Sequence, residues 1–268
     1  MKLYVLLIAS ILLCTAKSNA QTSDRAKYEV YYRMTFQKDT VENKTMEDFM
    51  VLRSNGNKSI FFSKDTYTLD SLLLTSQGEA ISMDIIANGT GKYGKRINSY
   101  CILKDFSMNK ETFTDNMGGN CVIYEEPIPK ITWTLIDSTK QIMGYKCQKA
   151  TCCFRGRNYE AWFTTDLPSN DGPWKFQGLP GLIMEVTDTK RQYVFEFVGL
   201  KNSNAEITLL NKDYSKTTRE KYLKTYKNYL KDPIGYISAS SGLKISIQGS
   251  ATRQVKTPAA RYSPMELY

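Results

Sequence analysis

Four carboxylates are the side chains in this sequence whose type and spacing come nearest to supporting a reaction. Asp166, Asp171, Glu185 and Asp188 lie close together along the chain. Two carboxyl groups held roughly 5 to 9 Å apart can hydrolyse a glycosidic bond, one as the acid and the other as the base or nucleophile. Glu185 alternates with apolar residues and is the first to inspect. The alternative is that all four are solvated charges at strand ends and turns.

The sequence contains no histidine. Ser-His-Asp and Cys-His arrangements need an imidazole as the base near neutral pH, and zinc hydrolases depend on histidine ligands. These mechanisms would require a histidine imidazole from another chain. No complete catalytic set is present, so the sequence favours a non-catalytic protein and predicts no cofactor.

The cysteines could serve in disulfides or in a metal site. Cys147, Cys152 and Cys153 could form a soft-metal site, because thiolates suit Cu(I) and zinc. They lack the CxxC spacing and the histidines of such sites, so no metal is predicted. The sequence favours one or two disulfides with a buried thiol left over, and Cys101 with Cys121 is one expected bridge.

The first 20 residues have the parts of a cleaved secretory signal. Lys2 is followed by an apolar run over Leu3–Leu13 and by the small-residue cleavage site Ser18-Asn19-Ala20. The mature protein is expected to begin near Gln21. No later stretch reaches the roughly 18 to 20 uncharged residues of a membrane helix, so we expect a mature chain without a transmembrane segment, in the periplasm or associated with the outer membrane.

The charge of the mature chain is moderately basic. Removing residues 1–20 deletes two lysines and no acid, which changes the net charge from +9 to 36 − 2 − 27 = +7. The basic residues are dispersed among acidic ones, unlike the dense basic patch of a nucleic-acid site. We therefore expect no nucleic-acid partner.

Short segments with a period of two dominate the chain and predict strands. The clearest is 28–36, and 50–53 and 59–63 flank Asn55-Gly56, a dipeptide typical of tight hairpins. The other expected strands are 97–103, 121–125, 131–136, 145–154, 159–164, 182–187, 193–198 and 207–210. This spacing predicts an all-β or β-dominated single domain over 21–251, an antiparallel meander curved into a half-barrel or sandwich, followed by a polar tail over 252–268.

One helix is expected. Thr217 or Thr218 can cap a segment whose apolar residues recur at three- and four-residue steps up to Leu230, and Asp232-Pro233 ends it. The glycines of 89–94 have the spacing of a dinucleotide fingerprint, but no amphipathic helix follows them. The segment is therefore expected to be a loop.

The most informative segment is Asp171–Ile183. Leu179-Pro180-Gly181-Leu182 fits a type II turn, because proline presets the first corner and glycine accepts a positive φ at the second. In one interpretation, this turn gives the segment a purely structural role. The other interpretation is an exposed recognition loop, in which large apolar side chains anchor a partner. Its binding residues would be Trp174, Phe176, Leu179 and Pro180.

This segment resembles the signature of the GLPGLI family of Bacteroidota envelope proteins, whose name Gly178–Ile183 spells in full. Other segments match the same family pattern: Gly144–Ala150, Phe154–Arg157, Ala161–Thr164 and Ser263–Leu267. The resemblance covers most of the mature chain and is most specific between Trp133 and Val186.

The resemblance implies export, a mainly β fold and association with outer-membrane nutrient uptake systems, without an established activity. The leading hypothesis is a non-catalytic binding or accessory protein whose partner is an outer-membrane transport protein or an envelope ligand. One alternative is a carboxylate-dependent hydrolase acting on glycans or peptides. Another is a structural component of the envelope.

Overall fold

The computed structural model describes residues 24–241 and 264–267, and they form one large open sheet. The sheet has 12 strands in the order β12-β6-β5-β4-β3-β2-β1-β11-β10-β9-β8-β7. Neighbouring strands are antiparallel except β12, which pairs with β6 in parallel. The β-dominated fold is therefore confirmed. The signal peptide over 1–20 and the expected domain boundary at 251 lie outside the described residues.

The strands are β1 (Tyr28–Asp39), β2 (Lys44–Ser54), β3 (Lys58–Ser63), β4 (Cys101–Asp105), β5 (Lys110–Met117), β6 (Asn120–Pro127), β7 (Thr134–Ile142), β8 (Tyr145–Phe154), β9 (Arg157–Thr164), β10 (Leu182–Asp188), β11 (Tyr193–Asn202) and β12 (Ser215–Lys216). The helices are α1 (Lys64–Leu73), α2 (Gly78–Asn88), the short 3₁₀ helix η1 (Gly91–Tyr93), α3 (Arg219–Lys231) and α4 (Pro233–Ser241). None of those in the described ranges is both long and apolar enough to cross a membrane.

Several elements agree with their local sequence. β2 and β3 form the hairpin expected at Asn55-Gly56, and Gly56 has a φ of 94°. α3 begins after Thr218, whose hydroxyl accepts a hydrogen bond from the Lys221 amide at 3.3 Å. A side-chain oxygen at this position satisfies an amide that the helix leaves unpaired.

Other elements differ from the expectation. α1 and α2 follow β3 where no helix was expected, and α4 follows α3 as a second C-terminal helix. β5 was also unexpected, while 207–210 makes no regular strand. The expected strand over 97–103 begins only at Cys101.

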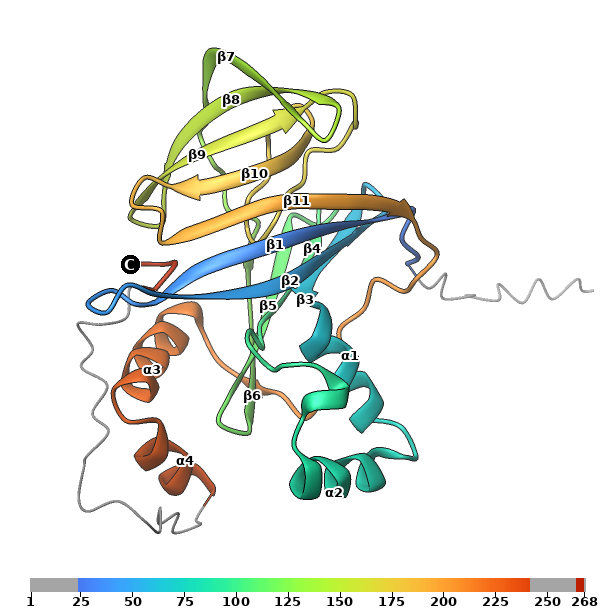
Figure 1. Cartoon of the computed structure of the whole chain (residues 1–268), viewed down its shortest axis with the longest axis vertical. Helices are drawn as coiled ribbons and strands as arrows, with labels where there is room; N and C mark the ends of the chain where they lie inside the picture. The colour runs from blue at the N-terminus through green and yellow to red at the C-terminus, as the bar shows by residue number, and fades with distance from the viewer. Residues whose placement is uncertain (1–23, 242–263, 268) are drawn as a thin grey trace, which may run out of the picture.

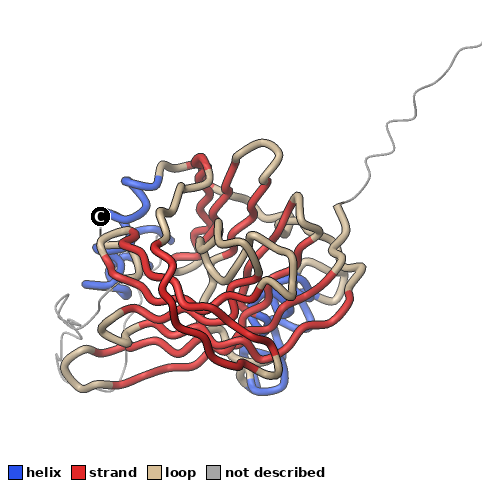
Figure 2. The backbone as a smooth tube through the Cα atoms, turned by 90° about the horizontal axis from the view of Figure 1, so that it is seen from above, coloured by secondary structure: helices blue, strands red, loops and turns tan. Residues whose placement is uncertain are grey.

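Both faces of the central strands are covered. In β3, Phe61 belongs to the main core on the inner face, whereas its neighbours Ile60 and Phe62 belong to a smaller core on the other face. This follows from the alternation of side chains along a strand. α1 packs on β2 and β3 (Figure 1). Figure 2 shows strands that curve around a centre filled by loop segments.

Candidate functional site

The signature segment lies in this centre, and its final corner is tighter than expected. The Gly181 amide donates to the Leu179 carbonyl at 2.8 Å. This bond closes a three-residue turn around Pro180 instead of the expected type II turn. A Cβ on Gly181 would lie 2.0 Å from the Thr164 carbonyl oxygen. Glycine is therefore needed here for the close approach of two backbone segments.

Three of the four residues expected in a recognition loop are buried. Trp174, Phe176 and Leu179 have exposed fractions of 3%, 0% and 1%, while Pro180 is exposed. The Phe176 ring centre lies 4.7 Å from that of Tyr159 in an edge-to-face contact, a geometry that aromatic rings favour. The three side chains form part of the main core, so they do not present the exposed recognition surface considered from the sequence.

Between these apolar side chains lies a fully buried lysine. The Lys175 Nζ is 3.0 Å from Glu111 Oε1 and 2.6 Å from Glu126 Oε1, and it donates to the Tyr124 hydroxyl at 3.1 Å. We call Lys175, Glu111, Glu126 and Tyr124 the Lys175 cluster. It joins the signature to β5 and β6, because Glu111 lies on β5 and the other two partners on β6.

The cluster keeps its lysine charged. Burial by itself lowers the pKa of Lys175, but negative charges led by Glu111 outweigh this effect and raise it above its ordinary value. Burial raises the pKa of Glu111, which Lys175 and Lys104 oppose only in part. For Glu126, burial also favours the neutral acid, yet Lys175 prevails and the pKa of Glu126 is lowered. The charge of Lys175 is thus fixed by several carboxylates together.

A second buried lysine holds Asp171, the first residue of the signature. Lys104 Nζ lies 2.7 Å from Asp171 Oδ1 and donates to the Phe176 carbonyl at 3.2 Å, and both charged side chains are almost fully buried. Burying an ion pair is costly unless its groups are hydrogen-bonded. Lys104 therefore holds both ends of the Asp171–Phe176 loop, through the Asp171 carboxylate and the Phe176 carbonyl.

The remaining expected carboxylates have separate surroundings. Asp188 is buried, with Arg157 Nη1 at 3.0 Å and the Tyr193 amide at 2.7 Å. Glu185 is partly exposed and pairs with Lys140. Asp166 is exposed in the turn after β9. The three ion-paired carboxylates therefore each have a different cation, and an acid–base role for any two of the four stays a prediction.

All five cysteines in the described part of the chain are free thiols. The expected Cys101–Cys121 bridge is wrong, because β5 lies between their strands. Two strand spacings separate the backbones by about 10 Å, beyond the reach of a disulfide. Cys147 and Cys152 are buried and Cys153 is exposed. Among the described side chains, no cluster of three or more cysteine or acidic groups could hold a metal.

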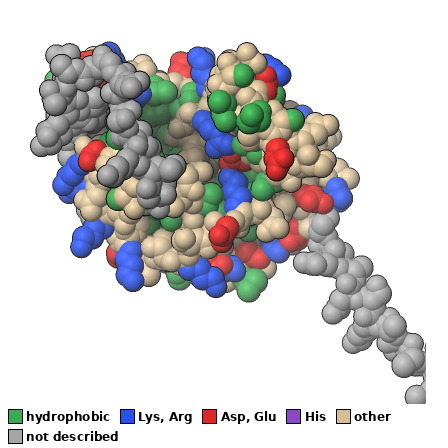
Figure 3. Space-filling view, turned by 90° about the horizontal axis from the view of Figure 1, so that it is seen from below, with side chains coloured by type: hydrophobic (Ala, Val, Ile, Leu, Met, Phe, Trp, Pro, Cys, Tyr) green, Lys and Arg blue, Asp and Glu red, His purple; other side chains and the backbone are tan. Residues whose placement is uncertain are grey.

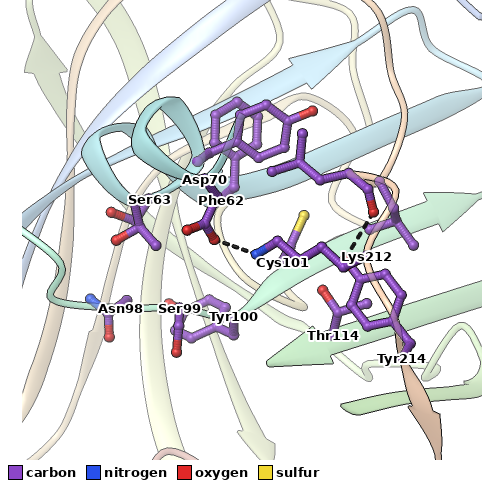
Figure 4. Close-up of a pocket in the computed structure, with 14 residues that line it drawn as sticks. Phe62, Ser63, Asp70, Asn98, Ser99, Tyr100, Cys101, Thr114, Lys212 and Tyr214 are labelled. Carbon is purple, nitrogen blue, oxygen red and sulfur yellow. Dashed lines mark hydrogen bonds and ion pairs between the residues drawn. The ribbon is translucent and has the colours of Figure 1, made fainter. Parts of the chain in front are cut away.

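A small hollow lies between α1, β4 and the segment before β12 (Figure 4). Asp70 forms ion pairs there with both Arg96 and Lys212. Burial raises the pKa of the Cys101 thiol beside it to about 12. The hollow has a cavity volume of about 20 Å³, which is room for roughly one or two waters. It is therefore too small for a glycan or peptide substrate.

The α1–α2 hairpin carries an unusual set of exposed apolar side chains. Met83 and Ile86 are 68% and 80% exposed, and Leu72 and Leu74 are 37% and 51% exposed. Met83 and Ile86 are three residues apart and share one side of α2. We call these four residues the hairpin surface. α2 lies at the lower end of the molecule in Figure 1, away from the sheet, and Figure 3 looks onto that end.

Neither the buried lysines nor the hairpin surface was predicted from the sequence. Lys175 lies between Trp174 and Phe176, and a charge that alternates with apolar residues is assigned to a solvated face by sequence patterns. Glu111 lies between Lys110 and Thr112, where no apolar alternation marks a buried strand. The apolar residues of 69–86 do recur at helical spacing, so the helices themselves could have been predicted. Because α2 is apolar on more than one side, its exposed side was not evident.

Comparisons with known proteins give a partial family match and a likeness of fold. A family model described as a protein of unknown function (Porph_ging) matches residues 155–185. No curated protein matches the chain. A structure of PNGF-II in the P21 space group superposes with a TM-score of 0.52 at 16% identity, covering 75% of this chain and 33% of that one. The chain thus spans about a third of the length of PNGF-II.

Two further solved structures are less similar. PNGF-II in the C2 space group has a TM-score of 0.49 at 17% identity, with 74% of this chain and 32% of that chain covered. An uncharacterized conserved protein from Thermus thermophilus has a TM-score of 0.37 at 8% identity, with 72% and 91% covered. At these identities the likeness to PNGF-II concerns the fold alone.

Proposed function

We propose that this chain is an exported envelope protein of the GLPGLI type that binds a protein partner as an accessory to an outer-membrane uptake system. The hairpin surface is the observation that supports a binding role. Large apolar side chains grouped on one exposed element mark interaction sites more often than scattered ones do. The family-model match over residues 155–185 includes the whole signature, Asp171–Ile183, and supports the assignment to the GLPGLI type.

The proposed partner contact is apolar and is made by helices. Met83 and Ile86 extend from one side of α2, as anchors do when a helix docks into a groove. Full burial of each side chain would contribute roughly 1.5 to 3 kcal/mol. Asp84, which lies between Met83 and Ile86 in the sequence, is already engaged within the hairpin region, because it pairs with Lys92 and accepts a hydrogen bond from the Tyr93 hydroxyl. The partner surface is therefore expected to be apolar at its centre.

The test compares two methionines of equal exposure. Met83 is 68% exposed on α2 and Met108 is 67% exposed in the turn between β4 and β5. We expect Met83→Glu to weaken binding to the outer-membrane transport protein at least tenfold in calorimetry, and Met108→Glu to leave it within twofold. Equal effects would contradict the proposed contact. Turnover of a glycan or peptide, abolished by one acidic substitution, would favour the hydrolase instead.

A further inference from the structure

The last described residues of the chain, Pro264–Leu267, return to the inner side of the sheet and lie against the signature. The segment 242–263 separates them from α4. Figure 1 shows this end close to α3, in agreement with the ion pair between Glu266 and Arg219 of that helix. The expected polar tail over 252–268 thus includes an anchored segment. Met265 belongs to the main core, and Glu266 is only 9% exposed.

The segment is held by its backbone. Arg157 donates to the Pro264 carbonyl from Nε at 2.9 Å and from Nη2 at 2.7 Å. The Tyr159 hydroxyl donates to the Met265 carbonyl at 3.4 Å. The Leu267 amide donates to the Arg155 carbonyl at 3.0 Å. An extended peptide is recognised in this way when backbone hydrogen bonds hold it and pockets read its side chains.

Glu266 places the negative charge of the segment among largely buried cations. Its carboxylate lies 3.0 Å from Lys175 Nζ, 2.6 Å from Arg219 Nε and 3.8 Å from Arg155 Nε. Lys175 and Arg155 also contact the carboxylates of the Lys175 cluster, Glu111 and Glu126. Buried charges are stable only when they are paired, so the three cations favour a carboxylate at this position. We call Arg155, Arg157, Tyr159, Lys175 and Arg219 the cradle.

We propose that the cradle is a peptide-binding site whose ligand is a proline, a large apolar residue and a glutamate in succession, and that the C-terminal segment of a second copy of this chain can occupy it. In the structure of the single chain, Pro264–Leu267 of that same chain fill the site. A tethered ligand acts at an effective concentration of up to millimolar order. The chain's own segment therefore outcompetes the segment of a second copy. We expect the segment of a second copy to enter the cradle when the contact within one chain is weakened.

The test uses the full mature chain and a fluorescent peptide with the sequence of residues 263–268. In Glu266→Ala, the chain's own segment loses its carboxylate while the cradle stays intact. We expect saturable 1:1 binding of the peptide to Glu266→Ala by fluorescence anisotropy, and at least tenfold weaker binding to wild type, whose site is filled. If Glu266→Ala does not fold, the same peptide titration is carried out on Met265→Ser, whose own segment loses its apolar contact and in which we also expect the peptide to bind.

Two altered peptides define the recognition. Replacing the glutamate of the peptide by glutamine is expected to weaken binding at least tenfold. Replacing its leucine by alanine should change binding less than twofold, because Leu267 is 49% exposed. The proposal is overturned if the peptide does not bind to a folded variant, or if the glutamate and glutamine peptides bind equally. The cradle and the hairpin surface lie on different elements, so this result is independent of the proposed function.

Discussion

Replacing Lys175 by methionine should destabilise the protein strongly, because it leaves buried carboxylates without their shared cation. The ammonium is fully buried and lies within 3.0 Å of three carboxylates. Glu126 keeps Arg155 at 2.9 Å and Glu266 keeps Arg219 at 2.6 Å. Glu111 is the group that loses its closest cation.

The magnitude follows from that one orphaned group. Removing one partner of a buried ion pair costs about 3 to 5 kcal/mol. We therefore expect Lys175→Met to lower the free energy of unfolding by this amount in urea denaturation followed by tryptophan fluorescence. Adding Glu111→Gln removes the orphaned charge. The double variant should therefore lose about 1 to 3 kcal/mol less unfolding free energy than the sum of the losses in the two single variants.

An exposed pair provides the control. Arg33 lies 2.9 Å from Glu196, and their side chains are 47% and 39% exposed. Exposed ion pairs contribute about 0 to 1 kcal/mol, so Arg33→Met should cost no more than that. If Lys175→Met costs as little as Arg33→Met, the Lys175 cluster does not stabilise the signature and the reasoning is refuted.

Three further predictions concern the scaffold. Gly181→Ala should cost more than about 2 kcal/mol, since its Cβ would lie 2.0 Å from a backbone oxygen, whereas Gly199→Ala, with open space around it, should stay within about 1 kcal/mol in the same assay. Burial raises the pKa of Asp115 above its ordinary value, so the Asp115 carboxyl group binds a proton more tightly in the folded state than in the unfolded state. Wild type should therefore gain unfolding free energy relative to Asp115→Asn as the pH falls from 7 towards about 4, and a constant difference would contradict this. Cys153 is exposed, while burial raises the pKa of Cys147 to about 11, so maleimide at about pH 7 should label Cys153 much faster, and Cys153→Ser should remove the fast phase.

Local patterns predicted the elements whose stability depends on neighbouring residues in the sequence. The β2–β3 hairpin has its Asn-Gly turn, and α3 has the Thr218 cap and an apolar stripe. In β1 the alternate residues Val30, Tyr32 and Met34 are buried in the main core, and the strand pairs with β2 and β11. In each case, turn chemistry or periodicity agrees with the tertiary contacts, which makes the assignment from sequence reliable.

Elements stabilised by distant charges were not predicted. β5 places Glu111 and Asp115 in buried positions, so it lacks the apolar alternation of a strand. Their partners lie far away in the sequence, because Lys175 holds Glu111 and the Tyr222 hydroxyl donates to Asp115 at 2.8 Å. Anchoring of the C-terminal segment has the same origin. A period of two cannot reveal a buried carboxylate whose cation is supplied by another segment.

Photo-crosslinking in the organism that encodes the chain tests the proposed binding role most directly. A photoreactive amino acid would replace Met83 on the hairpin surface or, as the matched control, Met108. We predict that position 83 crosslinks to an outer-membrane transport protein and that position 108 does not. Crosslinking of that protein at position 108 alone, or at neither position, would contradict a partner contact through α2.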